Sequence, residues 1–147
     1  MERVLSEILS DKGGRVVCVH PETSVESAAK TMKRERIGAI LVIHDDQLSG
    51  IMTERDILNR VVAEGKPPGE IKVSEIMTHD VIVIDPGCTV RQAMQIVSEK
   101  RLRHLPVLRD GRLEGMLSAG DLTRSIVEED EDVIDTLHEF IRGGYPG

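Results

Sequence analysis

Apolar residues recur with helical spacing in two stretches of the chain, 65 positions apart. One stretch carries Val25, Ala28, Ala29 and Met32, and the other carries Val90, Ala93, Met94 and Val97. The spacing i, i+3, i+4, i+7 predicts a helix with one buried face in each stretch. Each helix also has a start signal, from Thr89 in the second stretch and from either Thr23 or Ser24 in the first.

Short apolar runs around these helices predict strands. A β-branched run at 16–19 precedes the first helix, and two further runs follow each helix, at 39–43 and 48–52 and again at 105–108 and 113–117. Turn residues separate the paired runs, Asp45-Asp46 in one case and Asp110-Gly111 in the other, which predicts two hairpins. Pro106 lacks an N–H group, so its strand is expected near an edge or a strand end.

A second amphipathic helix is predicted after each hairpin. Its apolar face consists of Ile57, Leu58, Val61 and Val62 in one copy and of Leu122, Ile126 and Val127 in the other. The order of elements is therefore β-α-β-β-α, twice. A shift of 65 positions superimposes identical residues without a gap, among them Pro21 on Pro86, Val42 on Val107, Gly50 on Gly115 and Asp56 on Asp121.

The repeat predicts an α/β (α+β) fold in which two tandem β-α-β-β-α units pack about a pseudo-twofold axis. We expect the first repeat at 1–66, the second at 67–128, and a C-terminal amphipathic helix with its tail at 129–147, with a plain linker at 65–69. Upstream, the segment 6–9 recurs as 74–77 at an offset of 68, so the first copy holds three extra residues around 12–15. The C-terminal stripe contains Val133, Ile134, Leu137, Phe140 and Ile141. Surplus apolar helix face on so small a fold predicts a homodimer.

Composition narrows the classes of function. The 147 residues include 26 acids and 19 bases, a formal net charge of −7, which disfavours binding to nucleic acid. No apolar run approaches the roughly 20 residues that span a membrane, and no signal peptide is evident at the N-terminus. Cys18 and Cys88 are isolated, so we expect small buried residues in a reducing compartment and a cytoplasmic protein.

The two copies resemble the CBS-domain family, named after cystathionine β-synthase. The resemblance is carried by the segments 50–57 and 115–122, each with Gly-x-x-[Ser/Thr]-x-x-Asp, together with 103–107 and 74–78. It implies a stand-alone CBS pair that forms a homodimer and regulates an unidentified partner protein. It also implies clefts between the repeats that bind an adenosine-containing ligand such as AMP, ADP, ATP, NAD or S-adenosylmethionine. That ligand is regulatory, and no cofactor is required.

Two strand-to-helix junctions are the candidate binding sites. Thr53 and Asp56 lie at one, and Ser118 and Asp121 lie at the other. Free N–H groups at a helix start suit a phosphate, the hydroxyl adds a donor, and the carboxylate can accept from both hydroxyls of a ribose. Gly120 leaves room for a ligand to approach. The alternative is that each Thr/Ser-x-x-Asp only caps its helix, and the two roles are compatible.

Basic residues make the two copies unequal. Arg103 and His104 stand where the first copy has Gly38 and Ala39. They are either surface residues at a strand end or ligands for phosphate, as the resemblance implies. Arg55, opposite Gly120 in the alignment of repeats, adds a possible charge to the first junction or is simply solvated. The resemblance further implies that the backbone near Val17 and Ile82 contacts the adenine edge.

Nothing in the sequence indicates an enzyme. Nucleophile-elbow, P-loop and dinucleotide-binding glycine motifs are missing, and the five histidines show no metal-ligand spacing. Two hypotheses of function remain. One is a sensor of adenosine-containing ligands, and the other is a structural or interaction dimer whose clefts are empty.

Overall fold

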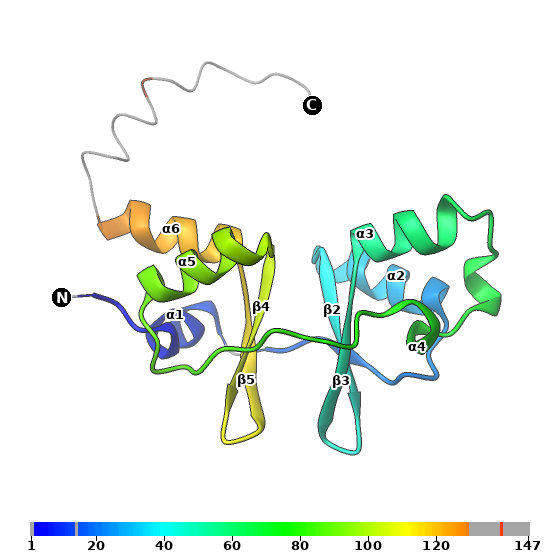
Figure 1. Cartoon of the computed structure of the whole chain (residues 1–147), viewed down its shortest axis with the longest axis horizontal. Coiled ribbons are helices and arrows are strands. Elements are labelled where there is room, and N and C mark those ends of the chain that lie inside the picture. Colours follow the sequence, from blue (N-terminus) through cyan, green and yellow to red (C-terminus); the bar gives the residue numbers. More distant parts are fainter. Residues whose placement is uncertain (1, 14, 130–138, 140–147) are drawn as a thin grey trace.

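The computed structural model describes residues 2–13, 15–129 and 139 and consists of two similar halves side by side (Figure 1). The first repeat contains α1 (Leu5–Lys12), β1 (Cys18–Val19), α2 (Val25–Glu35), β2 (Ala39–His44), β3 (Gln47–Thr53) and α3 (Glu54–Ile57), which continues as the π-helical turn η1 (Leu58–Val62). The second contains the 3₁₀ turn η2 (Pro68–Glu70), α4 (Val73–Ile76), α5 (Val90–Lys100), β4 (His104–Arg109), β5 (Arg112–Ser118) and α6 (Ala119–Glu129). The predicted α/β class is confirmed, and the order of elements recurs except that the first strand of the second copy is reduced to a single bridge.

The helix starts and the hairpin turns follow the local chemistry of the sequence. Ser24, not Thr23, caps α2 and accepts a hydrogen bond from Ser27 N at 3.0 Å. Thr89 caps α5 in a full capping box with Gln92. The β2–β3 turn places Asp45 and Asp46 at positive φ, and the β4–β5 turn does the same with Asp110 and Gly111. Such turns suit the twist of a two-residue hairpin, and Asp and Gly tolerate them.

Pro106 shortens the sheet of the second repeat. In the first repeat β1 runs parallel to β2, with Cys18 opposite Leu41 and Val19 opposite Val42. The second repeat keeps only the bridge between Ile84 and Val107, which is equivalent to the second of these pairs. The other pair would require an N–H at position 106, which proline lacks. Pro106 thus limits the pairing of β4 on this side to one bridge. In the first repeat, the strand expected at 16–19 is limited to the two residues of β1.

The two repeats exchange their first helices. α1 precedes the first repeat but joins the second, where Leu5 N donates to Cys88 O at 2.9 Å and Val90 N donates to Arg3 O at 3.0 Å. α4 makes the equivalent connection to the first repeat, through Val25 N to Ile71 O at 2.8 Å. Figure 1 shows α1 beside β4–β5 and α4 beside β2–β3. The sequence repeats are therefore not the same units as the spatial halves.

Each half has its own core because of this exchange. One core contains residues of α2, β2 and β3 together with Val73 and Ile76 of α4 and with Met77, which follows α4. The other unites α5, β4, β5 and α6 with Leu5, Ile8 and Leu9 of α1. A third, smaller cluster joins the two hairpins across the axis and contains Ala39, Leu41 and Ile51 with Leu113 and Met116 packed against it. The halves are thus held together by exchanged helices and by a shared apolar seam.

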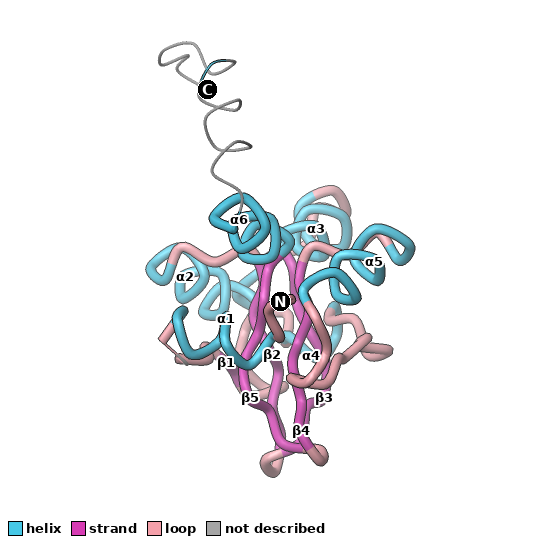
Figure 2. Tube along the Cα trace, turned by 90° about the vertical axis from the view of Figure 1, so that its left-hand side faces the viewer, coloured by secondary structure: helices cyan, strands magenta, loops and turns pink. Residues whose placement is uncertain are grey.

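The helices α2, α5 and α6 and the segment formed by α3 and η1 lie toward one end of the molecule, opposite the hairpin turns (Figure 2). The apolar faces predicted for the second helix of each repeat are only partly buried there. Val61 and Leu122 belong to the core, whereas Leu58, Val62 and Ile126 are 57%, 65% and 41% exposed. η1 is a π-helical turn and α6 is a regular α-helix, so exposed apolar side chains occur in both geometries. The C-terminal stripe at 133–141 lies outside the described residues apart from Glu139.

The expected burial of the cysteines is wrong in one case. Cys18 is exposed and Cys88 is half-buried. Among the described residues β1 is the edge strand of its sheet, and its side chains alternate between the two faces: Cys18 is exposed, whereas Val19 is half-buried. Over the described residues, no helix is long and apolar enough to cross a membrane.

Candidate functional site

The two strand-to-helix junctions have the same hydrogen-bonded frame. At the first, Thr53 N donates to Asp56 Oδ2 at 2.9 Å, and Asp56 N donates to Thr53 Oγ1 at 3.1 Å. At the second, Ser118 N donates to Asp121 Oδ2 at 2.8 Å, and Asp121 N donates to Ser118 Oγ at 3.0 Å. Each pair is therefore a reciprocal cap of its helix. The capping alternative holds for both, and each Asp still has one oxygen outside the cap.

At the second junction two cationic side chains donate hydrogen bonds to the carboxylate of Asp121. Lys12 Nζ donates to Asp121 Oδ2 at 2.8 Å, and Arg124 Nη2 donates to Asp121 Oδ1 at 2.8 Å. Lys12 also donates to Met116 O at 3.0 Å. Lys12 comes from the exchanged helix α1, so the N-terminal end of the chain contributes directly to the cleft of the second repeat.

The electrostatics of Asp121 follow from these partners. Burial raises the pKa of Asp121, but the hydrogen bonds from Lys12 and Ser118 outweigh it, and the pKa lies below its ordinary value. The carboxylate is consequently ionised at neutral pH and remains a strong acceptor.

The first junction has a different set of partners. Asp56 is only 9% exposed, and its Oδ1 accepts a long hydrogen bond from Thr78 Oγ1 at 3.4 Å. Arg60 Nε lies 4.0 Å from the same oxygen, while its Nη1 donates to Ile76 O at 2.9 Å. The hydroxyl of Thr78 thus reaches the Asp56 oxygen outside the cap, whereas the ammonium of Lys12 reaches the Asp121 oxygen that also accepts from the cap.

The extra residues at 12–15 explain this difference. Ile51 and Met116 are equivalent positions of the two repeats. After the short helix α4 the backbone is extended, and Thr78 and Ile51 form two backbone hydrogen bonds with each other, at 2.8 and 3.0 Å. α1 instead continues for eight residues, and the backbone of Met116 receives the ammonium of Lys12. The longer helix therefore replaces a backbone bridge with a charged side chain.

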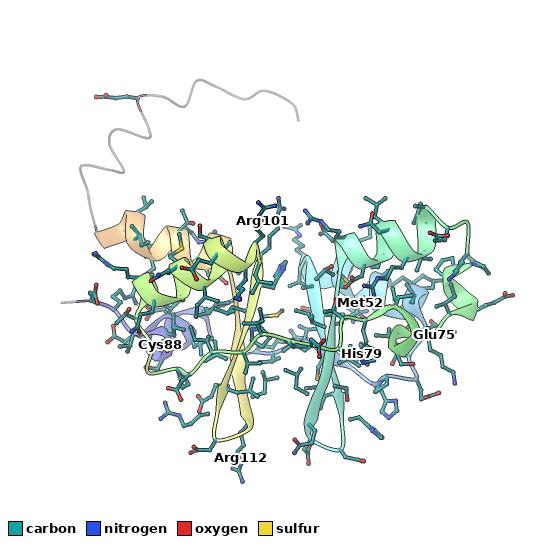
Figure 3. All side chains as sticks on the ribbon, in the orientation of Figure 1. Met52, Glu75, His79, Cys88, Arg101 and Arg112 are labelled. Carbon is teal, nitrogen blue, oxygen red and sulfur yellow. The ribbon has the colours of Figure 1, made fainter. Side chains whose placement is uncertain are left out.

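His104 lies where the two halves meet. A Cβ atom on Gly38 would lie 3.4 Å from His104 Nε2 and 3.2 Å from Glu54 Oε1, so a residue of the second repeat faces two of the first. Arg103 is exposed, and its carbonyl accepts from Ala119 N at 2.8 Å. A groove of about 390 Å³ opens beside this point, lined in part by Lys33, Arg36, Gly38 and Glu54. Arg101, the equivalent of Arg36, lies at the same helical end between the halves (Figure 3).

Burial lowers the pKa of His104, and the nearby cations Lys12 and Arg103 act in the same direction, against the opposing effect of Glu54. His104 therefore binds a proton less readily in the folded protein than in the unfolded chain. Its stabilising contribution is present above its unfolded pKa of about 6.5 and is lost as the pH falls through that value.

We expect the free energy of unfolding to fall between pH 7.5 and pH 5.5, and to fall less in His104→Gln, which cannot titrate. Urea unfolding at both pH values measures the difference. Asp121, with its lowered pKa, contributes its own loss only near pH 4 and below, outside this window. An equal fall in parent and variant would contradict the assignment to His104.

The remaining predicted site residues differ in how exposed they are. Arg55 is exposed on α3. Val17 is half-buried directly before β1, and Ile82 is 36% exposed in the extended segment before Ile84. A Cβ on Gly120 would make only ordinary contacts, the nearest being Ser118 Oγ at 3.5 Å, so the protein's own packing does not require glycine at that position.

Sequence reasoning missed Lys12, Thr78, Arg60, Arg124 and Glu54. Arg60 and Arg124 follow their aspartates at helical spacing, which was a usable signal. Lys12 and Thr78 reach their clefts only because the helices exchange, and no local pattern reports that. The structure also brings His20 and His44 together, with ring centroids 5.0 Å apart, a contact that their spacing in the sequence did not indicate. Among the described residues, no group of three potential metal ligands accompanies them.

Comparison with known proteins agrees with this architecture. A family model described as the CBS domain matches residues 5–63 and 73–128. CBS domain-containing protein CBSX3, mitochondrial, from Arabidopsis thaliana is 33% identical over 150 residues, which cover 96% of this chain and 73% of that protein. A solved structure of a putative signal-transduction protein with CBS domains from Burkholderia ambifaria MC40-6 is 36% identical, with a TM-score of 0.83 over 87% of this chain and 96% of that chain.

A hexameric CBS-CP12 protein from bloom-forming cyanobacteria is 30% identical, with a TM-score of 0.77 over 95% of this chain and 85% of that chain. The paired repeats, their exchanged helices and the two capped junctions define a tandem-repeat α/β module. The chain belongs to the CBS-domain family, as its two motifs indicated. CBS-domain proteins are generally regulatory modules that bind adenosine-containing ligands.

Proposed function

We propose that this protein is a sensor that binds an adenine nucleotide or a related adenosine-containing ligand in the clefts between its repeats. The observation that carries the proposal is the pair of equivalent junctions, each with a carboxylate fixed by a reciprocal cap and a hydroxyl at the start of a helix. In this arrangement Asp121 and Asp56 accept from ribose hydroxyls, and the Ser118 and Thr53 hydroxyls face a phosphate.

The surroundings favour a ligand with negative charge. Arg103 and His104 border the point where the halves meet, and Lys33 and Arg36 line the groove beside it. The family's general activity supports the same ligand class, with AMP, ADP, ATP, NAD and S-adenosylmethionine as candidates. We assign no catalytic step to any residue, and the protein acts through a change in shape or in affinity for a regulated partner.

A thermal-shift screen with these five ligands tests the proposal. A ligand present at about 100 times its dissociation constant stabilises the folded protein by about 2.7 kcal/mol. We expect a clear rise in melting temperature with at least one adenine nucleotide and none with inorganic phosphate at the same concentration. No shift with any ligand at millimolar concentration would favour a structural dimer with empty clefts.

We also propose that the protein is a homodimer. The apolar side chains of Leu58 and Val62 on η1 and of Ile126 on α6 are exposed, and Val62 lines an apolar groove of about 280 Å³ between α2 and η1. The hexameric CBS-CP12 relative assembles from a similar chain.

Replacing Leu58 and Val62 together with Gln removes part of this face without touching either cleft. We expect the parent to sediment as a dimer at micromolar concentration and the variant to shift toward monomer. A parent that sediments as a monomer would contradict the prediction.

A further inference from the structure

The ammonium of Lys12 covers the carboxylate to which the proposed function assigns the ribose. Its Nζ donates to Asp121 Oδ2 at 2.8 Å and to Met116 O at 3.0 Å. The Lys12 side chain is 46% exposed and that of Asp121 is 11% exposed. Lys12 is therefore the more solvent-exposed partner of this pair.

The cleft of the first repeat has no equivalent ammonium among its described partners. Asp56 faces the neutral hydroxyl of Thr78 at 3.4 Å, and Arg60, 4.0 Å away, is already committed to the carbonyl oxygens of Ile76 and Met77. Lys12 lies among the extra residues of the first copy, so the second copy supplies no matching lysine to the first junction. The two clefts thus share a carboxylate and differ in the charge placed next to it.

On the basis of the proposed function, we propose that Lys12 makes the cleft of the second repeat selective for anionic adenine nucleotides. A ribose diol that takes over Asp121 Oδ2 deprives Lys12 of its counter-ion. The ammonium stays nearby, because Met116 O still holds it and the α1 backbone is fixed by its packing in the second core.

The ammonium then loses a favourable interaction with an opposite charge. A phosphate-bearing ligand supplies the missing negative charge, and its attraction is strengthened by Arg103 and Arg124. Adenosine supplies no charge, and S-adenosylmethionine carries net positive charge, so both leave the ammonium uncompensated. Lys12 is therefore a specificity-determining residue that competes with uncharged ligands for Asp121.

Lys12→Met tests this inference, because it keeps the length of the side chain and removes its charge. Calorimetric titration with AMP and with adenosine gives the ratio of the two affinities. We expect this ratio to fall about five- to tenfold in Lys12→Met, with adenosine binding more tightly than to the parent. Lys12→Arg should retain the parent ratio. Lys30→Met is the matched control, since it removes the same charge from an exposed position on α2.

Each outcome of the titration decides a separate question. A parent that binds neither AMP nor adenosine overturns the proposed function and this inference with it. A parent that binds both, with a ratio that stays within twofold in Lys12→Met, overturns the role of Lys12 alone. A merely structural role of Lys12 would weaken both ligands equally and leave the ratio unchanged.

A second readout needs no ligand. The hydrogen bond from Lys12 contributes to the low pKa of Asp121. The Asp121 pKa, followed by NMR, should therefore rise in Lys12→Met and stay low in Lys12→Arg. An Asp121 pKa that does not move in Lys12→Met would show that the contact is missing in solution and would overturn the inference as well. In Asp121→Ala, the effect of Lys12→Met on the affinity ratio should disappear, as expected for two residues that act on each other.

Discussion

Gly50→Ala should destabilise the protein by about 3 kcal/mol, at the upper end of the cost of overpacking a core. A Cβ at this position on β3 would lie 2.7 Å from Met77 Sδ and 2.8 Å from the backbone oxygen of Thr78. That oxygen accepts from Ile51 N at 3.0 Å, so it cannot retreat without breaking the bridge that joins α4 to the first half. Urea unfolding measures the loss, and a variant that fails to fold agrees with the prediction.

Gly115→Ala is the natural control, because Gly115 is the equivalent position of the second repeat. There the added Cβ would lie 2.6 Å from Leu9 Cδ2, but the next nearest atoms are 3.6 Å away. The clash involves only the far end of a flexible side chain, so we expect a cost of about 1 kcal/mol. Neither glycine has a positive φ. Equal losses in the two variants, or a larger loss in Gly115→Ala, would contradict the role of the Thr78 backbone.

These two glycines also show how far the sequence predicts the fold. Their recurrence at a spacing of 65 was visible, as were the helix caps at Ser24 and Thr89, the hairpin turns and the β-α-β-β-α order. All of these depend on local chemistry, such as a side chain that bonds its own backbone or a turn that needs positive φ. What the glycines contact was not visible, since Leu9 and Met77 come from helices that cross to the other repeat.

The candidate site likewise has a part that the sequence predicts and a part that it does not. The frame of Thr53 with Asp56 and of Ser118 with Asp121 follows from a three-residue spacing, and the structure confirms it as a reciprocal cap. The charge around each carboxylate does not follow from spacing, because Lys12 is 109 positions from Asp121 and Thr78 is 22 positions from Asp56. The segment at 12–15 was recognised as an insertion, but its effect depends on the exchange of α1.

Two features departed from the sequence pattern for physical reasons. Leu58 and Val62 were expected on a buried helix face, yet both are exposed on η1, as Ile126 is on the regular helix α6. Cys18 was expected in a buried strand, and the strand exists but lies at an edge. Periodicity predicts which residues share a face of a regular helix or strand. It does not predict where the regular geometry ends or which edge of a sheet stays uncovered.

Asp121→Ala should lower the affinity for an adenine nucleotide about 10- to 150-fold. Hydrogen bonds to a charged group contribute about 1.5–3 kcal/mol, and the substitution removes the proposed acceptor of the ribose hydroxyls. It also removes one half of the cap on α6, which costs about 1 kcal/mol of stability. Calorimetric titration together with urea unfolding measures the two losses separately.

Asp121→Asn distinguishes the two roles of this residue. Its amide oxygen can still accept from Ser118 N, so the cap is largely kept, whereas the charge that holds ribose and Lys12 is lost. We therefore expect Asp121→Asn to bind weakly, while it keeps the cap and loses only the stability that the ion pairs with Lys12 and Arg124 contribute. Asp56→Ala supplies the comparison in the other cleft, where the carboxylate is more buried and the stability loss should be larger. If all three variants bind as well as the parent while the two alanine variants unfold at lower urea, the aspartates only cap their helices and the assignment of the ribose to them is wrong.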